Sequence, residues 1–160
     1  EGPFFLYVGA FDPRRQVELL VEWFSRAAGA VAERLVLCGS PSRAQRPALD
    51  ARLERGGLQD RVVLLERVPR RTLASLYRRA TAHVMLSRYE GFGLQVAEAM
   101  ACGLPVICSN TSSLPEVAGQ AAILCDPDRV NEMLTAFLGD GAVPHVEGAR
   151  GDRDPAGVVV

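Results

Sequence analysis

The chain has 160 residues, 48% of them hydrophobic and 23% charged, which is enough apolar material for one domain with its own core. Its net charge of −1 excludes a general attraction to nucleic acid or to an anionic membrane surface. All 18 basic residues are Arg, so a cationic contact to a phosphate must come from a guanidinium, which can bind it in a bidentate manner.

The cysteine pattern argues against both a disulfide scaffold and a zinc site. The four cysteines, Cys38, Cys102, Cys108 and Cys125, show no CxxC spacing, and three of them lie in or beside apolar, strand-like runs. We therefore expect buried free thiols, no metal, and a reducing compartment, the cytoplasm. No apolar run approaches ~18 residues and the first residues lack a signal pattern, so we expect a soluble chain.

Apolar runs and helical patterns alternate along the chain. Short apolar runs predict six strands, at residues 4–8, 35–39, 62–65, 82–86, 105–108 and 121–125. Helical spacing predicts helices at 16–28, 47–55, 71–80, from 94 to about 101, and 130–138. This alternation predicts an α/β domain over residues 1–138, with a doubly wound, six-stranded parallel sheet of Rossmann-like type and its ligand at the carboxyl ends of the strands. Residues 139–160 are rich in Gly, Pro, Asp and Arg, and we expect a loosely ordered tail there.

The stretch from residue 87 to 106 predicts a strand end, a glycine loop, a helix and a new strand. Gly91 and Gly93 allow the backbone of the loop to approach a ligand closely. The free N–H groups at the start of the helix, together with its dipole, would form an anion site that a phosphate fits. One helical face forms an apolar stripe, the usual core-facing side of a helix, and consists of Leu94, Ala97 and Ala101.

Two motifs carry a resemblance to a known family: Glu90-Gly-Phe-Gly-Leu-x-x-x-Glu98 and Ser112-Ser-Leu-Pro-Glu116. With the flanking sequence from about residue 4 to 127, they are similar to the carboxy-terminal, donor-binding half of the retaining glycosyltransferase family 4, which has the GT-B fold. The resemblance implies transfer of a hexosyl group from an NDP-sugar to an acceptor hydroxyl, with no metal or other cofactor. It also implies a missing amino-terminal acceptor-binding domain, through which alone the protein would touch a membrane.

The resemblance assigns roles to the residues of these motifs. Glu98 would bind the ribose, Glu90 would lie beside the donor sugar near its reacting carbon, and the backbone N–H groups of residues 91–94 would contact the sugar and the diphosphate. Arg15, where relatives usually carry Lys, would stabilise the diphosphate leaving group as the glycosidic bond breaks. The full set of candidate residues is Glu90 and Arg15 as catalytic, and Gly91, Phe92, Gly93, Leu94, Glu98, Ser87 and Arg14 as donor-binding.

Other interpretations stay open at this point. Taken singly, each carboxylate fits a solvated helix face or a turn, Phe92 fits simple packing, and Ser87 fits a strand-end cap. Many relatives carry an Arg directly after the glycine of the first strand, where this chain has Ala10, so a non-catalytic scaffold or regulatory module is an alternative. An NDP-sugar epimerase or a phosphorylase can also share the fold. The base and sugar of the donor are undetermined, with GDP-mannose a first guess from the similarity to mannosyltransferase-like members.

Overall fold

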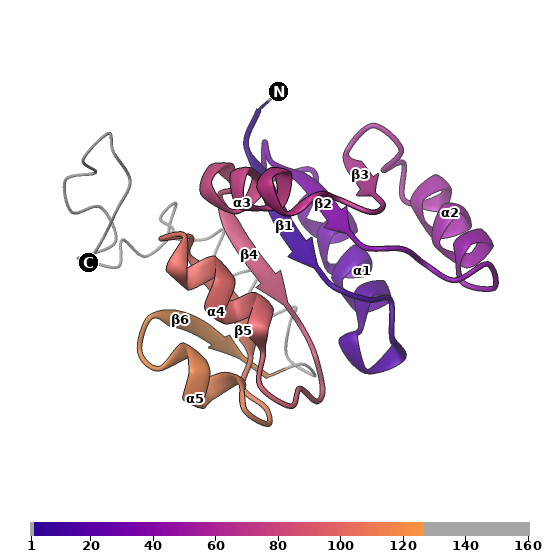
Figure 1. The fold of residues 1–160 in the computed structure, drawn as a ribbon. Coiled ribbons are helices and arrows are strands. Elements are labelled where there is room, and N and C mark those ends of the chain that lie inside the picture. The colour runs from indigo at the N-terminus through magenta and orange to yellow at the C-terminus, as the bar shows by residue number, and fades with distance from the viewer. Residues whose placement is uncertain (1, 127–160) are drawn as a thin grey trace.

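The computed structural model describes residues 2–126, which form one parallel sheet with helices on both faces (Figure 1). The sheet order is β3-β2-β1-β4-β5-β6, and every neighbouring pair of strands is parallel. The predicted doubly wound α/β fold is confirmed, and all six expected strands are present. They are β1 (Phe4–Val8), β2 (Arg34–Cys38), β3 (Val62–Leu65), β4 (Ala82–Met85), β5 (Val106–Ser109) and β6 (Ala122–Cys125).

Four helices follow the strands as expected, with bounds that differ from the predicted ones by one residue at most, whereas α5 was not among the predicted ranges. The α-helices are α1 (Val17–Ala27), α2 (Arg46–Arg55), α3 (Arg70–Arg79), α4 (Leu94–Ala101) and α5 (Leu114–Ala118). A short 3-10 helix, η1 (Pro13–Arg15), precedes α1 and was not predicted. The helix predicted at 130–138 and the tail predicted at 139–160 lie outside the described residues.

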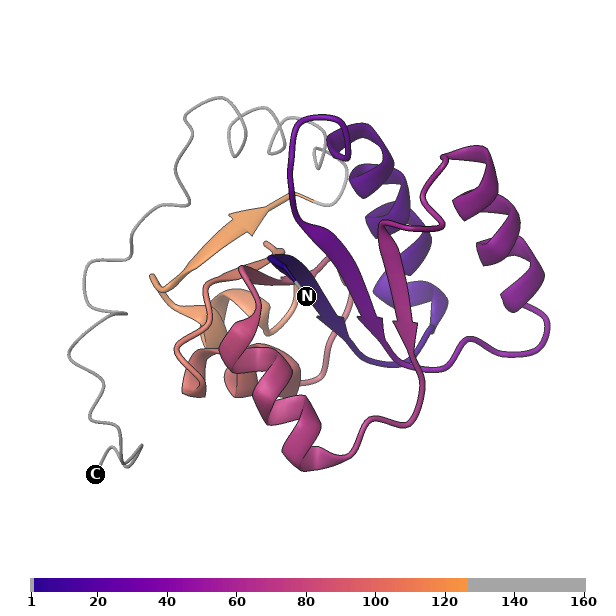
Figure 2. The same ribbon diagram turned by 90° about the horizontal axis from the view of Figure 1, so that it is seen from above.

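Different helices cover the two faces of the sheet (Figure 2). Helices α1 and α2 pack on one face, and α3, α4 and α5 pack on the other. Successive residues of β1 point to opposite faces, so Phe5 and Tyr7 join the first core while Leu6 joins the second. Because both faces are covered, the central strands are continuous apolar runs, which is why they were predicted correctly.

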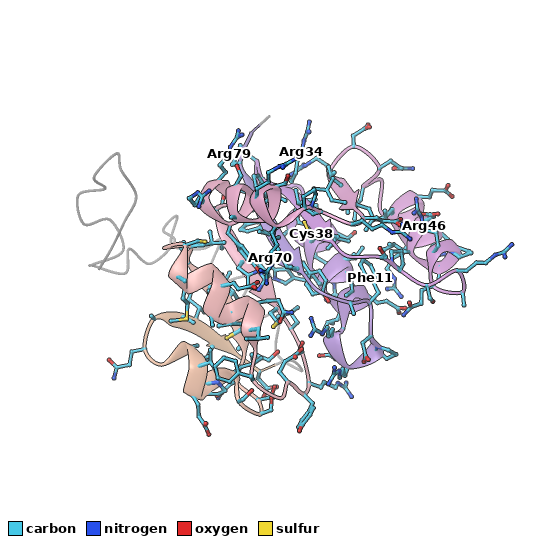
Figure 3. The ribbon with its side chains drawn as sticks, viewed as in Figure 1. Phe11, Arg34, Cys38, Arg46, Arg70 and Arg79 are labelled. Atoms are coloured by element: carbon cyan, nitrogen blue, oxygen red, sulfur yellow. The ribbon has the colours of Figure 1, made fainter. Side chains whose placement is uncertain are left out.

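The sheet reverses its direction of winding between β1 and β4. From β1 the chain adds β2 and β3 on one side, and it then returns to add β4, β5 and β6 on the other side. The register pairs Phe5 with Ala82 and Leu6 with His83, so β1 and β4 are neighbours. All strands run the same way as β2, which Figure 3 shows passing from Arg34 to Cys38. The loops after β1 and β4 therefore diverge from the carboxyl edge at the switch point, where folds of this type bind ligands.

The buried face of α4 is not the one predicted. Val96 and Ala99 are fully buried, whereas Leu94 is 63% exposed and Ala101 is also exposed. Both sets of residues fit helical spacing, so the pattern alone does not fix the rotation of the helix. The backbone at the start of α4 determines this rotation. Gly93 has a φ of 89°, and its Cα packs so closely on Leu114 that a Cβ would lie 2.7 Å from Leu114 Cδ2.

A matched pair of substitutions tests this assignment of buried and exposed faces. Leu20→Ala in α1 removes a side chain that is 1% exposed and should lower the free energy of unfolding by roughly 2–5 kcal/mol. Leu94→Ala removes a side chain that is 63% exposed and should change that free energy by less than about 0.5 kcal/mol. Urea unfolding of both variants gives the comparison, and a large loss in Leu94→Ala would contradict the observed rotation of α4.

His83 makes the stability of the domain dependent on pH. The side chain is fully buried in β4, with Nδ1 3.0 Å from the carbonyl oxygen of Leu6, and burial lowers its pKa to about 4. The unfolded chain binds this proton near pH 6.5, so the free energy of unfolding should fall as the pH drops from about 6.5 towards 4, by up to about 3 kcal/mol. Urea unfolding at stepped pH should show a flatter profile in His83→Phe. An unchanged slope in that variant would rule out His83 as the source.

Candidate functional site

The loops that follow β1 and β4 are joined by direct contacts. The amide of Arg88 donates to the carbonyl oxygen of Arg14 at 2.8 Å. Gln16 has left-handed backbone angles, and with its amide nitrogen facing the carbonyl oxygen of Leu86 it bridges that oxygen at 2.6 Å and Arg88 Nε at 2.8 Å. The switch point therefore holds two loops that are 75 residues apart in the chain, as the separation of Arg15 and Glu90 shows.

Arg15 and Glu90 form a buried ion pair where these loops meet. Only 9% of Arg15 and 5% of Glu90 are exposed. Arg15 Nη2 donates to Glu90 Oε2 at 3.3 Å, and Arg15 Nε lies 3.2 Å from Oε1. Ser87, which is fully buried, donates from Oγ to Glu90 Oε1 at 2.8 Å. Three of the residues predicted for the site are thus in direct contact.

The backbone around Arg15 explains how its long side chain enters the site. In η1 the Asp12 side chain accepts from the amide of Arg14 at 3.0 Å, which fixes the turn that presents Arg15. The guanidinium then passes across Gly9, at the end of β1, where a Cβ would collide with Nη1. Tyr7 donates its hydroxyl to the carbonyl oxygen of Ala10 at 2.6 Å and so secures the same loop. A glycine at position 9 is therefore required by the position of the guanidinium.

Two nitrogens of the Arg15 guanidinium, Nε and Nη1, are buried and make no hydrogen bond with residues 2–126. Nε lies within ion-pair distance of Glu90, whereas Nη1, beside the Tyr7 hydroxyl, has no anionic partner among these residues. A buried donor without an acceptor costs about 1–3 kcal/mol, and more for a charged group. This group can therefore donate to an anion that enters the site.

A second set of unused donors lies at the start of α4. The amides of residues 91–95 have no protein acceptor within the described part of the chain, and Gly93 is the N-cap residue. The amides at a helix start carry the positive end of the helix dipole, which favours an anion there. The side chains of Phe92 and Leu94 are 56% and 63% exposed, so neither is packed into the core of residues 2–126.

Three hydroxyl residues after β5 hold the Glu90 loop in place, and sequence reasoning missed this role. Thr111 donates from Oγ1 to the carbonyl oxygen of Ser87 at 2.9 Å. The amide of Glu90 donates to Ser112 Oγ at 2.9 Å, and Ser113 Oγ donates to the carbonyl oxygen of Glu90 at 3.0 Å. The signal for these contacts was present, because β5 neighbours β4 and a run of short hydroxyl side chains at its carboxyl end can satisfy loop backbone groups.

The remaining candidates, Glu98 and Arg14, lie apart from the ion pair. Glu98 is exposed on α4, one turn beyond the free amides, and accepts a hydrogen bond of 3.1 Å from the hydroxyl of Tyr77. The Arg14 side chain is 46% exposed, and its Nε lies 3.5 Å from Asp12 Oδ1. The roles that the resemblance assigned to both residues stay predictions.

The titratable side chains away from the ion pair give few candidates for other chemistry. The four cysteines are free, and burial raises the pKa of Cys38 and Cys108 to about 11 and that of Cys125 to about 12. These thiols stay protonated and are poor nucleophiles at neutral pH. Within residues 2–126, no three His, Cys, Asp or Glu side chains gather into a possible metal site. No helix in that range is long and apolar enough to span a bilayer.

Comparison with known proteins identifies the family. The sequence profile of the family described as glycosyl transferases group 1 matches residues 1–138. The chain belongs to this family. The family predicted from the two motifs is thereby confirmed.

Two curated relatives show how much of a group 1 protein the chain represents. It is 36% identical over 150 residues to the O-antigen chain mannosyltransferase B of Escherichia coli, an alignment covering 91% of the chain and 39% of that protein. It is 33% identical over 157 residues to the D-inositol 3-phosphate glycosyltransferase of Mycobacteroides abscessus, covering 89% of the chain and 35% of the relative. The chain thus spans well under half the length of these relatives.

Solved glycosyltransferase structures share the fold. The sucrose-phosphate synthase from Thermosynechococcus elongatus superposes with a TM-score of 0.77 at 32% identity, over 90% of this chain and 37% of that one. Anabaena HepE, solved in complex with UDP-glucose, superposes with a TM-score of 0.73 over 88% of this chain and 40% of its own, at 18% identity. These similarities confirm the GT-B type of α/β domain.

Two Arg–Glu pairs that differ in burial test the importance of the ion pair for this group 1 domain. Arg15→Met leaves Glu90 charged and buried, and should lower the free energy of unfolding by roughly 3–5 kcal/mol. Arg26→Met breaks an exposed pair with Glu22 on α1 and should cost less than about 1 kcal/mol. The double variant Arg15→Met, Glu90→Gln should recover much of the free energy of unfolding that Arg15→Met loses, as measured by urea unfolding. If Arg15→Met and Arg26→Met lower the free energy of unfolding equally, the buried pair of Arg15 and Glu90 is not a stabilising contact.

Proposed function

We propose that this chain is the donor-binding part of a retaining glycosyltransferase, which transfers a hexosyl group from an NDP-sugar to an acceptor hydroxyl. The acceptor would bind to a further, amino-terminal domain. The support for this division is that the chain covers 39% and 35% of the lengths of two curated relatives that are named as glycosyltransferases. The chain alone should therefore bind the donor and transfer little or nothing.

The unused donor of Arg15 is the observation that carries the proposal. It is buried, charged and without an acceptor in the described residues, and it belongs to the same switch point as the free amides of residues 91–95. A diphosphate offers several anionic oxygens, so it can accept from the guanidinium and from the amides together. Arg15 and the amides then take the place that a divalent ion holds in other phosphate sites, and we propose that no metal is needed.

The roles of the side chains follow from the reaction. As the bond between the anomeric carbon and the phosphate oxygen breaks, its electron pair stays with the departing diphosphate, where Arg15 and the amides stabilise the growing charge. The acceptor oxygen bonds to the anomeric carbon on the same face, and its proton passes to the departing phosphate. Glu90, held by Arg15 and Ser87, would orient the hexose, and Glu98 would hold the ribose.

Backbone amides supply most of the hydrogen-bond donors of the proposed site, so the relatives, rather than the side chains, indicate the base and the sugar. A mannosyltransferase is 36% identical to the chain, which favours a GDP-mannose donor. HepE and the pneumococcal GtfA, which share the fold at 18% and 20% identity, were solved with UDP-glucose and with UDP and GlcNAc.

Three buried free thiols fit a reducing compartment, and we propose the cytoplasm.

Calorimetric titration with UDP, GDP and ADP tests the proposal. At least one of them should bind weakly, and Arg15→Met should reduce that affinity at least tenfold, since a charged hydrogen-bond donor contributes about 1.5–3 kcal/mol. Arg26→Met, on the exposed surface of α1, should bind as the unsubstituted chain does. Removal of divalent ions with EDTA should leave the affinity unchanged. If none of the three nucleotides binds at millimolar concentration, the proposal is wrong.

The alternative of a non-catalytic module has one observation in its favour. Ala10 provides no side-chain donor at the loop after β1, where relatives often carry Arg. Under this alternative Glu90→Gln would leave the activity of the protein with its acceptor domain unchanged, because there would be none to lose. A transferase should instead lose most of its turnover of GDP-mannose or another NDP-sugar in that variant.

A further inference from the structure

Tyr77 connects the core of the domain to the exposed Glu98 carboxylate. The Tyr77 side chain lies between α3 and α4 and is 2% exposed. Its ring packs edge-to-face against His83 of β4, with a distance of 5.8 Å between the ring centroids. The hydroxyl donates to Glu98 Oε2 at 3.1 Å. A fixed, buried ring thus presents one hydrogen bond to a carboxylate that makes no other hydrogen bond or ion pair with residues 2–126.

The direction of helical side chains places Glu98 next to the free amides. Side chains on an α-helix lean towards its amino terminus, so the Glu98 carboxylate covers the turn that begins at Leu94. That turn carries the unused amides of residues 94 and 95, and those of residues 91–93 directly precede it. The Glu98 carboxylate is therefore next to the proposed diphosphate site, where the ribose of a bound nucleotide would lie.

We propose that Tyr77 is a positioning residue for nucleotide binding, because its hydroxyl fixes the Glu98 carboxylate in the orientation that accepts from the ribose hydroxyls of a nucleoside diphosphate. The inference rests on the proposed function. An ionised carboxylate has about four lone-pair sites, and Tyr77 occupies one of them on Oε2. The others stay open for the two hydroxyls. A carboxylate that is already oriented loses less conformational entropy when the nucleotide binds.

The hydroxyl of Tyr77 acts only as a donor in this arrangement. Burial, and then the charge of Glu98, raises the pKa of Tyr77, so the phenol is protonated at neutral pH. Tyr77→Phe keeps the ring and its contact with His83 and removes the O–H alone. The substitution therefore separates the hydrogen bond from the packing.

Calorimetric titration with UDP, GDP and ADP, each paired with its 2′,3′-dideoxy form, tests the role of Tyr77. For the ribonucleotide that binds, Tyr77→Phe should weaken affinity roughly three- to tenfold, the effect of one hydrogen bond. Affinity for the dideoxy form should not change, because it has no ribose hydroxyls for Glu98 to bind. Ser75→Ala, which removes an exposed hydroxyl from the same helix, should alter neither affinity. In a Glu98→Ala background, Tyr77→Phe should have no further effect.

Each outcome of this titration decides the proposal. The ratio of ribonucleotide to dideoxynucleotide affinity does not depend on the fraction of folded protein, so a loss of stability in Tyr77→Phe cannot imitate the expected result. An equal loss for both forms leaves the ratio unchanged and would mean that Tyr77 acts by packing. An unchanged ratio, with or without such a loss, would overturn the inference while leaving the proposed function standing. If the unsubstituted chain binds none of the three nucleotides, both fall together.

Discussion

The buried ion pair between Arg15 and Glu90 is the constraint that the rest of the site has to satisfy. Removal of two charges from water costs several kcal/mol for each ion, and their attraction offsets that cost only when the geometry is good and the remaining polar atoms are bonded. The surrounding residues meet this condition for Glu90, whereas Nη1 of Arg15 is left without an acceptor among residues 2–126. Ser87 bonds a Glu90 oxygen, Ser112 and Ser113 bond its backbone, and Gly9 leaves space for the guanidinium. The gathering of small polar residues at one edge of an apolar sheet follows from this single pair.

The ion pair also determines how the site can attract an anion. The charges of Arg15 and Glu90 cancel, and the whole chain carries a net charge of −1, so the ion pair itself adds no net charge that would attract phosphates. At the ion pair, attraction comes from directed hydrogen-bond donors, namely Arg15 Nη1 and the amides of residues 91–95. Such donors act at hydrogen-bond distance and select an anion by the positions of its oxygens. Binding of this kind should depend little on ionic strength, in contrast to binding by a basic surface.

The fold was predictable from the sequence because its strands are buried on both faces and its turns carry glycines. Contacts within the glycine loop and the first turn of α4 were also predictable, since they are local. The rotation of α4 was not, because two faces of the helix fit the same spacing and a contact between Gly93 and Leu114 decides between them. The hydroxyl residues after β5 and the bond from Tyr77 to Glu98 were missed for the same reason. Their partners are 21 to 24 residues away, and only the packing of neighbouring elements brings them together.

The two halves of the sheet are joined unevenly. Five residue pairs connect β1 to β2, but only two connect β1 to β4, at Phe5–Ala82 and Leu6–His83. Arg15 follows β1 and Glu90 follows β4, so their ion pair connects the two halves of the sheet at its carboxyl edge, beyond the two paired positions. The hydrogen bond from the Arg88 amide to the Arg14 carbonyl oxygen connects the same two loops. The binding site and the connection between the two halves of the sheet are therefore built from the same residues.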